Sequence, residues 1–260
     1  MRKFSLYLIA VVVFCASCQF KLDSAEDDRH DNAVTIERFD RLQSRYLTTG
    51  DYAALQQMST QYPTETRTLI EDVLQLGEVS DPHINSQFLS FYQDTTLQVI
   101  LNEVQIQYAD LSDVSQAMES AFQRLRRNVP ELSVPRIYTQ VGALNQSVVI
   151  SDSTIGISLD KYLGADFEPY TRFYDEQERA TMTRANIVPD CILFYLLSRY
   201  PLKDFETRPQ EDRDEHMGKV MWATNQILGK AHFNTPFVKK AANYAHAHPH
   251  ENIPQLLKSN

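Results

Sequence analysis

Apolar side chains recur with a helical period through the first half of the chain. Ile36, Phe39 and Leu42 fall on one face of a segment that begins near residue 34. Gly50 ends this predicted helix, and Asp51 is placed to cap the next one. Similar spacing after a start signal predicts further helices that begin at Pro63, within 81–94, after Asp94, and after Asp110 or Ser112.

The period of the apolar positions changes from 3.6 to two between residues 134 and 160. Three short runs carry β-type spacing: 134–141, 147–152 and 154–160. In the last run Ile155, Ile157 and Leu159 point to one side, and Gly156, Ser158 and Asp160 point to the other. Because turn residues separate the runs, the pattern predicts a small antiparallel meander at 134–160.

Helical spacing returns in the last third of the chain, over about 167–182, 187–200, 212–230, 236–247 and 252–258. The segment 191–197 is apolar on all sides, which is typical of a central buried helix. The whole pattern predicts an α+β fold that is mostly α, with a helical N-terminal half, a small sheet and a helical C-terminal half.

The N-terminal residues have the pattern of an export signal. Arg2 and Lys3 precede an apolar run at 6–14, which is shorter than the roughly 20 residues that span a bilayer. Small residues then precede Cys18, as in a bacterial lipobox, although Cys15 stands where leucine is usual. We expect a lipoprotein signal peptide at 1–17, lipidation of Cys18, and a single domain at 34–260. The alternative is an ordinary secretory signal with an incidental cysteine.

Composition narrows the function classes further. The chain has 34 acidic and 25 basic residues, and its densest basic patch, 124–128, fits the C-terminal end of a helix. A basic stripe for nucleic acid is not seen, so we expect no nucleic-acid partner. Residues 18–33 are polar and acidic and predict a flexible tether between the lipid and the domain. After removal of the signal peptide, Cys191 would be the one cysteine besides the lipidated Cys18. We expect Cys191 to be a buried apolar side chain.

Candidate chemistry outside the sheet region is weak. His246, His248 and His250 alternate near the C-terminus, but Pro249 interrupts them and acidic or cysteine ligands at zinc spacing do not accompany them. Glu215 and Lys219 are four residues apart and predict a surface ion pair. We therefore predict neither a metal site nor a cofactor.

An aromatic run at Tyr162, Phe167, Tyr170, Phe173 and Tyr174 leaves two interpretations open. Aromatic faces could line a peptide or sugar groove. Helical spacing within the run favours core packing instead.

The segment 135–170, PRIYTQVGALNQSVVISDSTIGISLDKYLGADFEPY, resembles the signature region of the gliding-motility lipoprotein family GldB. The blocks MTRANIVPDCI (182–192) and GKVMW (218–222) resemble later parts of the same family. This resemblance covers most of the chain after the signal region. It implies a cell-envelope lipoprotein anchored to the membrane through its lipidated cysteine.

The GldB family in turn resembles zinc metallopeptidases, in which a helix after the sheet carries His-Glu-x-x-His and a later helix supplies a third ligand. This chain departs from that pattern, because 187–201 contains no histidine and Met217, not an acid, precedes Gly218. The resemblance therefore implies a degenerate, zincin-like scaffold without catalytic residues. In it, Asp160, Lys161, Tyr162 and Gly164 are expected at the rim of the former cleft.

The expected function is that of a non-catalytic envelope lipoprotein, an interaction or assembly factor of gliding motility or secretion machinery with an envelope protein as its partner. The alternative is a peptide- or glycan-binding protein, or an unusual hydrolase, that uses the former protease cleft.

Overall fold

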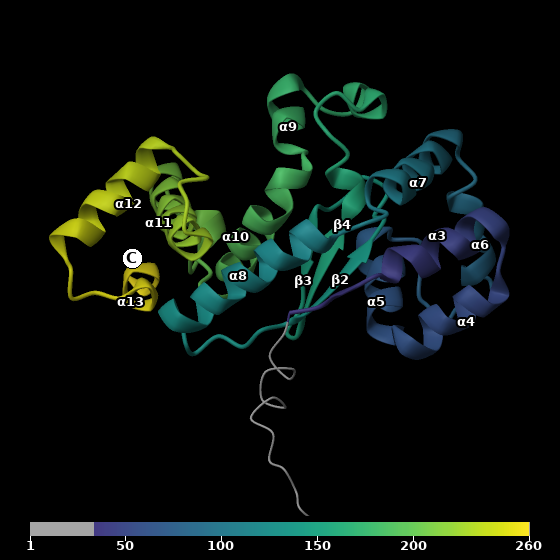
Figure 1. The fold of residues 1–260 in the computed structure, drawn as a ribbon, viewed down its shortest axis with the longest axis horizontal. Coiled ribbons are helices and arrows are strands. Elements are labelled where there is room, and N and C mark those ends of the chain that lie inside the picture. Colours follow the sequence, from purple (N-terminus) through teal and green to yellow (C-terminus); the bar gives the residue numbers. More distant parts are fainter. Residues whose placement is uncertain (1–33, 260) are drawn as a thin grey trace, which may run out of the picture. The chain divides into compact units, whose positions relative to one another are not determined.

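The computed structural model describes residues 34–259, and its four strands form one mixed sheet (Figure 1). The order of the strands is β1-β2-β4-β3, so β4 is an interior strand and β3 lies at an edge. β1 pairs with β2 and β2 pairs with β4 in parallel, whereas β3 pairs with β4 antiparallel. The strand bounds are Ile36–Glu37 (β1), Arg136–Gln140 (β2), Val148–Ile150 (β3) and Thr154–Ser158 (β4).

The prediction of strands in the sheet region is confirmed, but the prediction of an antiparallel meander is wrong. Alternation of side chains shows which residues share a face, and it does not show which strand is the neighbour. Here residues 141–147, which we call the crossover loop, pass over the end of β4 and place β3 beyond it. The hairpin at 151–153 then returns the chain to the interior position.

The N-terminal half of the domain is helical, as predicted. The prediction of a helix from residue 34 is wrong at its start, because Ile36 belongs to β1. Asp51 and Asp94 cap the helices that follow them, with side chains that accept from Ala53 N and from Thr96 and Leu97 N. The helical elements are α3 (Phe39–Thr49), α4 (Tyr52–Gln61), α5 (Pro63–Arg67), the π-helix η1 (Thr68–Val73), α6 (Ile84–Phe91), α7 (Thr95–Gln107) and α8 (Ser112–Asn128).

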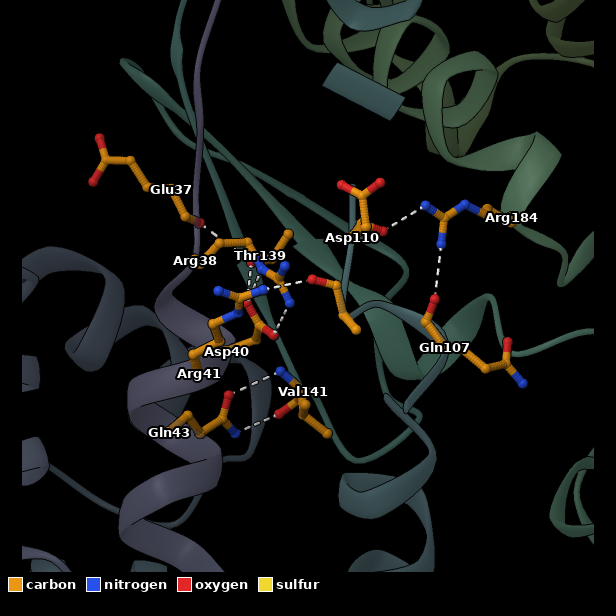
Figure 2. A network of polar contacts seen from close by, with 11 residues as sticks. Glu37, Arg38, Asp40, Arg41, Gln43, Gln107, Asp110, Thr139, Val141 and Arg184 are labelled. Carbon is orange, nitrogen blue, oxygen red and sulfur yellow. Dashed lines mark hydrogen bonds and ion pairs between the residues drawn. The ribbon is translucent and has the colours of Figure 1, made fainter. Parts of the chain in front are cut away.

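Helix α3 is joined to the end of β2 by buried polar side chains (Figure 2). Asp40 is fully buried, pairs with Arg38 at 2.8 Å and accepts from the Thr139 hydroxyl. The side-chain amide of Gln43 in α3 pairs with the main chain of Val141, as a neighbouring strand would. Its nitrogen donates to Val141 O at 2.7 Å, and its oxygen accepts from Val141 N at 2.8 Å. These contacts pair both main-chain groups of Val141, and its oxygen also accepts from the Tyr92 hydroxyl.

Both faces of β4 are covered, which explains why all five of its residues are buried. Ile155 and Ile157 belong to the hydrophobic core. On the other face, Gly156 leaves room for the Tyr138 ring of β2, because an added Cβ would lie 2.6 Å from Tyr138 Cζ. The alternation predicted for this strand is therefore present, but its second face meets protein instead of solvent.

The C-terminal half is also helical, although the helix predicted at 167–182 is broken. Pro169 lies in a short 3-10 turn, and Asp175 restarts the chain with a capping box that involves Glu178. The helical elements are η2 (Leu159–Lys161), η3 (Glu168–Arg172), α9 (Glu176–Thr181), η4 (Arg184–Asn186), α10 (Ile187–Arg199), η5 (Phe205–Thr207), α11 (Gln210–Leu228), α12 (Pro236–Ala247) and α13 (Ile253–Lys258).

Helix α10 packs against strands β3 and β4, and also against helices α8 and α11. Eight of its thirteen residues are buried, including Cys191, Ile192 and Leu196, none of which has any exposed surface. The prediction of a central buried helix is confirmed for most of this run, but Phe194 is 38 % exposed, so one side of the helix is not covered. Burial raises the pKa of the Cys191 thiol, which fits an unreactive apolar side chain.

Candidate functional site

The four residues predicted at the cleft rim separate into three kinds of environment. Asp160 is fully buried, so its predicted place at the rim is wrong. Its carboxylate accepts from Gly142 N at 2.8 Å and from Leu144 N at 2.6 Å. Asp160 lies in η2, two residues after the end of β4, and it therefore holds the crossover loop over the end of that strand.

The crossover loop needs this support because its backbone is strained. Ala143 and Leu144 both have positive φ angles, 52° and 66°, which non-glycine residues rarely adopt. Asn145 adds a further contact, since its side-chain amide donates to Val73 O in η1 at 2.8 Å. Burial raises the pKa of Asp160, while the loop N–H groups act in the opposite direction.

Gly164 makes a turn and is not among the residues that line the pocket described below. Its φ angle of 109° is accessible to glycine and strained for other residues. Its N–H donates to Met182 O at 3.0 Å, which joins the turn after η2 to the segment that precedes η4.

Lys161 and Tyr162 line a pocket of about 230 Å³. The side chain of Lys161 turns back toward the crossover loop, where Nζ donates to Tyr174 Oη at 2.8 Å and lies 3.4 Å from Leu144 O. The Tyr174 hydroxyl donates to the same carbonyl at 2.7 Å. The other residues that line the pocket are Ser147, Tyr174, Glu178, Thr181, Met182 and Asp190.

Tyr162 and Asp190 form a hydrogen-bonded pair in the lining of this pocket. The Tyr162 hydroxyl, on a residue only 2 % exposed, donates to Asp190 Oδ2 at 2.9 Å. Burial raises the pKa of Asp190 to about 6, and the hydrogen bond from Tyr162 acts against this rise. Tyr162 is fixed in turn by the Tyr108 hydroxyl, which donates to its main-chain oxygen.

Sequence reasoning missed Asp190. It lies in the first turn of α10, where an acidic residue is commonly explained by the helix dipole. The available signal was that Asp190 directly precedes the continuous apolar run at 191–197. An acidic side chain at that point is either paired or faces a pocket.

The aromatic run that left two interpretations open is mainly core. Tyr162 and Tyr170 are buried, and the Tyr170 ring lies edge-to-face with Phe167 at 5.0 Å and with Tyr174 at 5.9 Å between centroids. Phe173 differs, because 61 % of its surface is exposed. Core packing therefore explains most of the run, and Tyr162 and Tyr174 also line the pocket.

A second pocket, of about 290 Å³, lies between α11, α12 and the C-terminal segment. The predicted pair of Glu215 with Lys219 is not formed there. Glu215 pairs with Lys240 of α12, and Lys219 donates to Ser259 O. Because these charged groups already have partners, this pocket is a weaker candidate for a functional site than the pocket that contains Asp190.

The predicted absence of a metal site stays a prediction. Among residues 34–259, no group of three His, Cys, Asp or Glu side chains is placed to hold a metal ion. The His248 ring stacks on Tyr244 at 4.1 Å between centroids, and its Nδ1 lies 2.9 Å from Tyr244 O.

The predicted signal peptide at 1–17, the lipidation site Cys18 and the tether at 18–33 lie outside the described residues. Across 34–259, the helices are all too short or too polar to cross a bilayer.

Comparisons with known proteins place the chain in a family. Searches of curated proteins and of solved structures found no match, so the likeness to zinc peptidases stays a prediction. The profile of the family described as "Gliding motility protein GldB" matches residues 22–258, which is nearly the whole chain. This chain therefore belongs to the GldB gliding-motility protein family.

Proposed function

We propose that this protein is a lipid-anchored lipoprotein of the cell envelope that serves gliding motility, or a related secretion machinery, as a non-catalytic interaction or assembly factor. The observation that carries the proposal is the family match over residues 22–258. Membership of the family associates the chain with gliding motility and suggests a cell-envelope location. The lipid anchor at Cys18 rests on the sequence pattern alone.

The packing of α10 supports a non-catalytic role. In the zinc peptidases that the family resembles, the corresponding helix presents two histidines to the metal. In this chain the helix instead contributes Cys191, Ile192 and Leu196 to the hydrophobic core. A buried thiol and buried aliphatic side chains do not activate water or attack a substrate.

An assembly factor also needs a surface for its partner, and α7 offers apolar side chains outside the core. Val99 is 48 % exposed and Ile106 is 62 % exposed. They are seven residues apart, so they lie on the same face of the helix about two turns apart. Exposed apolar side chains on one face are a reason to search for a partner there.

The test is crosslinking in cells that express the tagged, membrane-anchored protein, followed by capture and mass spectrometry. A photo-crosslinking amino acid at Ile106 probes α7, and the same amino acid at exposed Gln116 of α8 is the control. Recurrent capture of one envelope protein from position 106, above the level from position 116, would support the assembly role. Equal background capture from both positions would contradict the use of α7, and an absence of any envelope partner would contradict the role itself.

A second role, ligand binding at the former cleft, is favoured by one specific observation. The pocket beside Lys161 and Tyr162 contains Asp190, a largely buried carboxylate that is held by a tyrosine hydroxyl. Protonatable groups of this kind occur at binding sites and at hydrolase sites. The two roles are separable, because the assembly role needs a protein surface and the second role needs the pocket.

A further inference from the structure

Asp190 is partly buried, and it differs from the fully buried Asp160 and Asp40 in how it is bonded. Asp160 accepts two main-chain N–H groups, and Asp40 has both an arginine and a threonine hydroxyl. Within the described part of the chain, Asp190 has one hydrogen-bond partner, the Tyr162 hydroxyl at 2.9 Å on Oδ2. A carboxylate has about four acceptor positions, so most of the capacity of Asp190 is unused.

This unused capacity faces a pocket instead of closed protein. Asp190 is among the residues that line the 230 Å³ pocket, and Glu178 of α9 adds a second acidic side chain. The cation in the same pocket, Lys161, is engaged by Tyr174 and by Leu144 O. The lining thus holds two carboxylates and one ammonium group, so it is net negative when both acids are ionised, and a cationic group would relieve the cost of burying Asp190.

The size and bonding of the pocket favour an alkyl ammonium group. A volume of about 230 Å³ is smaller than the roughly 300–1,000 Å³ of sites for organic ligands, so it suits one side chain. A guanidinium binds best to both oxygens of a carboxylate, and here one of the two acceptor positions of Oδ2 is already taken by the Tyr162 hydroxyl, which leaves Oδ1 as the freer oxygen. An ammonium group needs one oxygen, and the rings of Tyr162 and Tyr174 with Met182 can contact its methylene chain.

The neighbouring strand indicates what carries this side chain. Ser147, which lines the pocket, directly precedes β3, and β3 is an edge strand. The side chains of Val148, Val149 and Ile150 are all partly exposed. An edge strand can pair with an extended peptide, whose side chains then enter pockets beside the sheet.

We propose that the pocket binds the lysine side chain of an extended peptide segment of a partner, with the ammonium group on Asp190 and the peptide backbone along β3. This inference rests on the second role proposed above, ligand binding at the former cleft, and is independent of the assembly surface on α7. It assigns Asp190 as the specificity residue and Tyr162 as the residue that positions it.

The test is calorimetric titration of the full-length protein in detergent with acetyl-Thr-Val-Lys-Val-Thr-amide. Two matched peptides replace the lysine with norleucine, which keeps the chain and removes the charge, or with arginine. We expect both to bind at least tenfold more weakly than the lysine peptide. Nα-acetyl-lysine methylamide, which lacks the flanking residues, should also bind more weakly, because it cannot pair along β3.

The protein variants decide whether Asp190 is the site. Asp190→Asn keeps the shape and an acceptor for Tyr162, and it should weaken the lysine peptide at least tenfold. The control, Glu176→Gln, removes one charge from an exposed position of α9 and should leave binding unchanged. Circular dichroism and urea unfolding will establish that both variants are folded.

The outcomes separate the two levels of the proposal. Equal binding of the lysine and norleucine peptides, or unchanged binding in Asp190→Asn, would overturn the lysine site and leave peptide binding at the cleft. If none of the peptides binds, both the lysine site and a peptide-binding role for the cleft are overturned. Neither result bears on partner capture from position 106, which tests the assembly role.

Discussion

The carboxylate of Asp160 accepts a hydrogen bond from Leu144 N at 2.6 Å, and this contact joins the end of an interior strand to a loop with positive φ angles. The second oxygen accepts from Gly142 in the same loop. Asp160 was expected at a cleft rim, but it is an internal support. The loop that it supports leads to Ser147, which lines the pocket.

We predict that Asp160→Ala lowers the free energy of unfolding by roughly 2–4 kcal/mol. The substitution leaves two buried main-chain N–H groups without acceptors, and each costs about 1–3 kcal/mol. Urea unfolding followed by circular dichroism measures the change. Asp166→Ala, at an exposed position in the same region, is the control and should alter stability by less than about 0.5 kcal/mol. Equal effects of the two variants would show that the carboxylate does not hold the loop.

A second prediction concerns Arg184, which connects η4 to the segment between α7 and α8 (Figure 2). Its guanidinium donates to Asp113, to Gln107 O at 3.0 Å and to Asp110 O at 2.7 Å. Lysine cannot make this planar set of bonds, so Arg184→Lys should lower the free energy of unfolding by about 1–3 kcal/mol.

The control for Arg184→Lys is the same change at Arg172. Arg172 pairs with Glu168 on an exposed helical turn, and its side chain is 57 % exposed. Such pairs contribute about 0–1 kcal/mol, so Arg172→Lys should be nearly neutral in the same unfolding experiment. A loss in Arg184→Lys no larger than in Arg172→Lys would contradict the structural role of Arg184.

The sequence predicts the features that depend on local chemistry, and it does not predict those that depend on the order of the strands in the sheet. Caps such as Asp51 and Asp94, and the apolar helix after Asp190, depend on local chemistry, and they were predicted correctly. The pairing of β2 with β4 depends on a loop that passes over a strand, and alternation contains no information about it. The fully buried position of Asp160 follows from that same topology, so the sequence could not distinguish a rim residue from an internal support.

The pocket shows a similar division. Lys161 and Tyr162 are expected from a resemblance to a family, and the structure places both in the lining of the pocket. Asp190 comes from a segment 28 residues after Tyr162 and meets it only in the folded chain. The apolar run after Asp190 marks that residue as unusual, but the identity of its partner needs the tertiary structure, because no local pattern links it to Tyr162.

The lipid anchor leads to a third prediction, for the region before residue 34. If Cys18 is lipidated, Cys18→Ala should move the protein from the membrane fraction to the soluble periplasmic fraction. Ultracentrifugation and immunoblotting of cell fractions measure this. Cys15→Ala is the matched control and should stay in the membrane. Retention of Cys18→Ala in the membrane at the level of the unmodified protein would refute the anchor.

A fourth prediction follows from the raised pKa of Asp190. A carboxyl group with a pKa of about 6 in the folded state and 3.8 otherwise binds its proton more tightly when the protein is folded. Its contribution to stability is therefore full at low pH, and it falls as pH rises from about 4 to about 6. The neighbouring Tyr162 and Cys191 do not contribute over this range, because burial raises the pKa of both groups.

Asp190→Asn removes this titration while keeping an acceptor for Tyr162. In the absence of ligand, the variant should therefore be more stable than the unmodified protein at pH 7.5, by up to roughly 3 kcal/mol, at 1.36 kcal/mol per pKa unit. The advantage should shrink toward zero near pH 4. Urea unfolding of both proteins across this range measures the difference, with Asp166→Asn as a control that should be flat. A difference that does not vary with pH would mean that Asp190 ionises as readily in the folded chain as in the unfolded one. The acid would then be too well solvated to favour the lysine side chain proposed for the pocket.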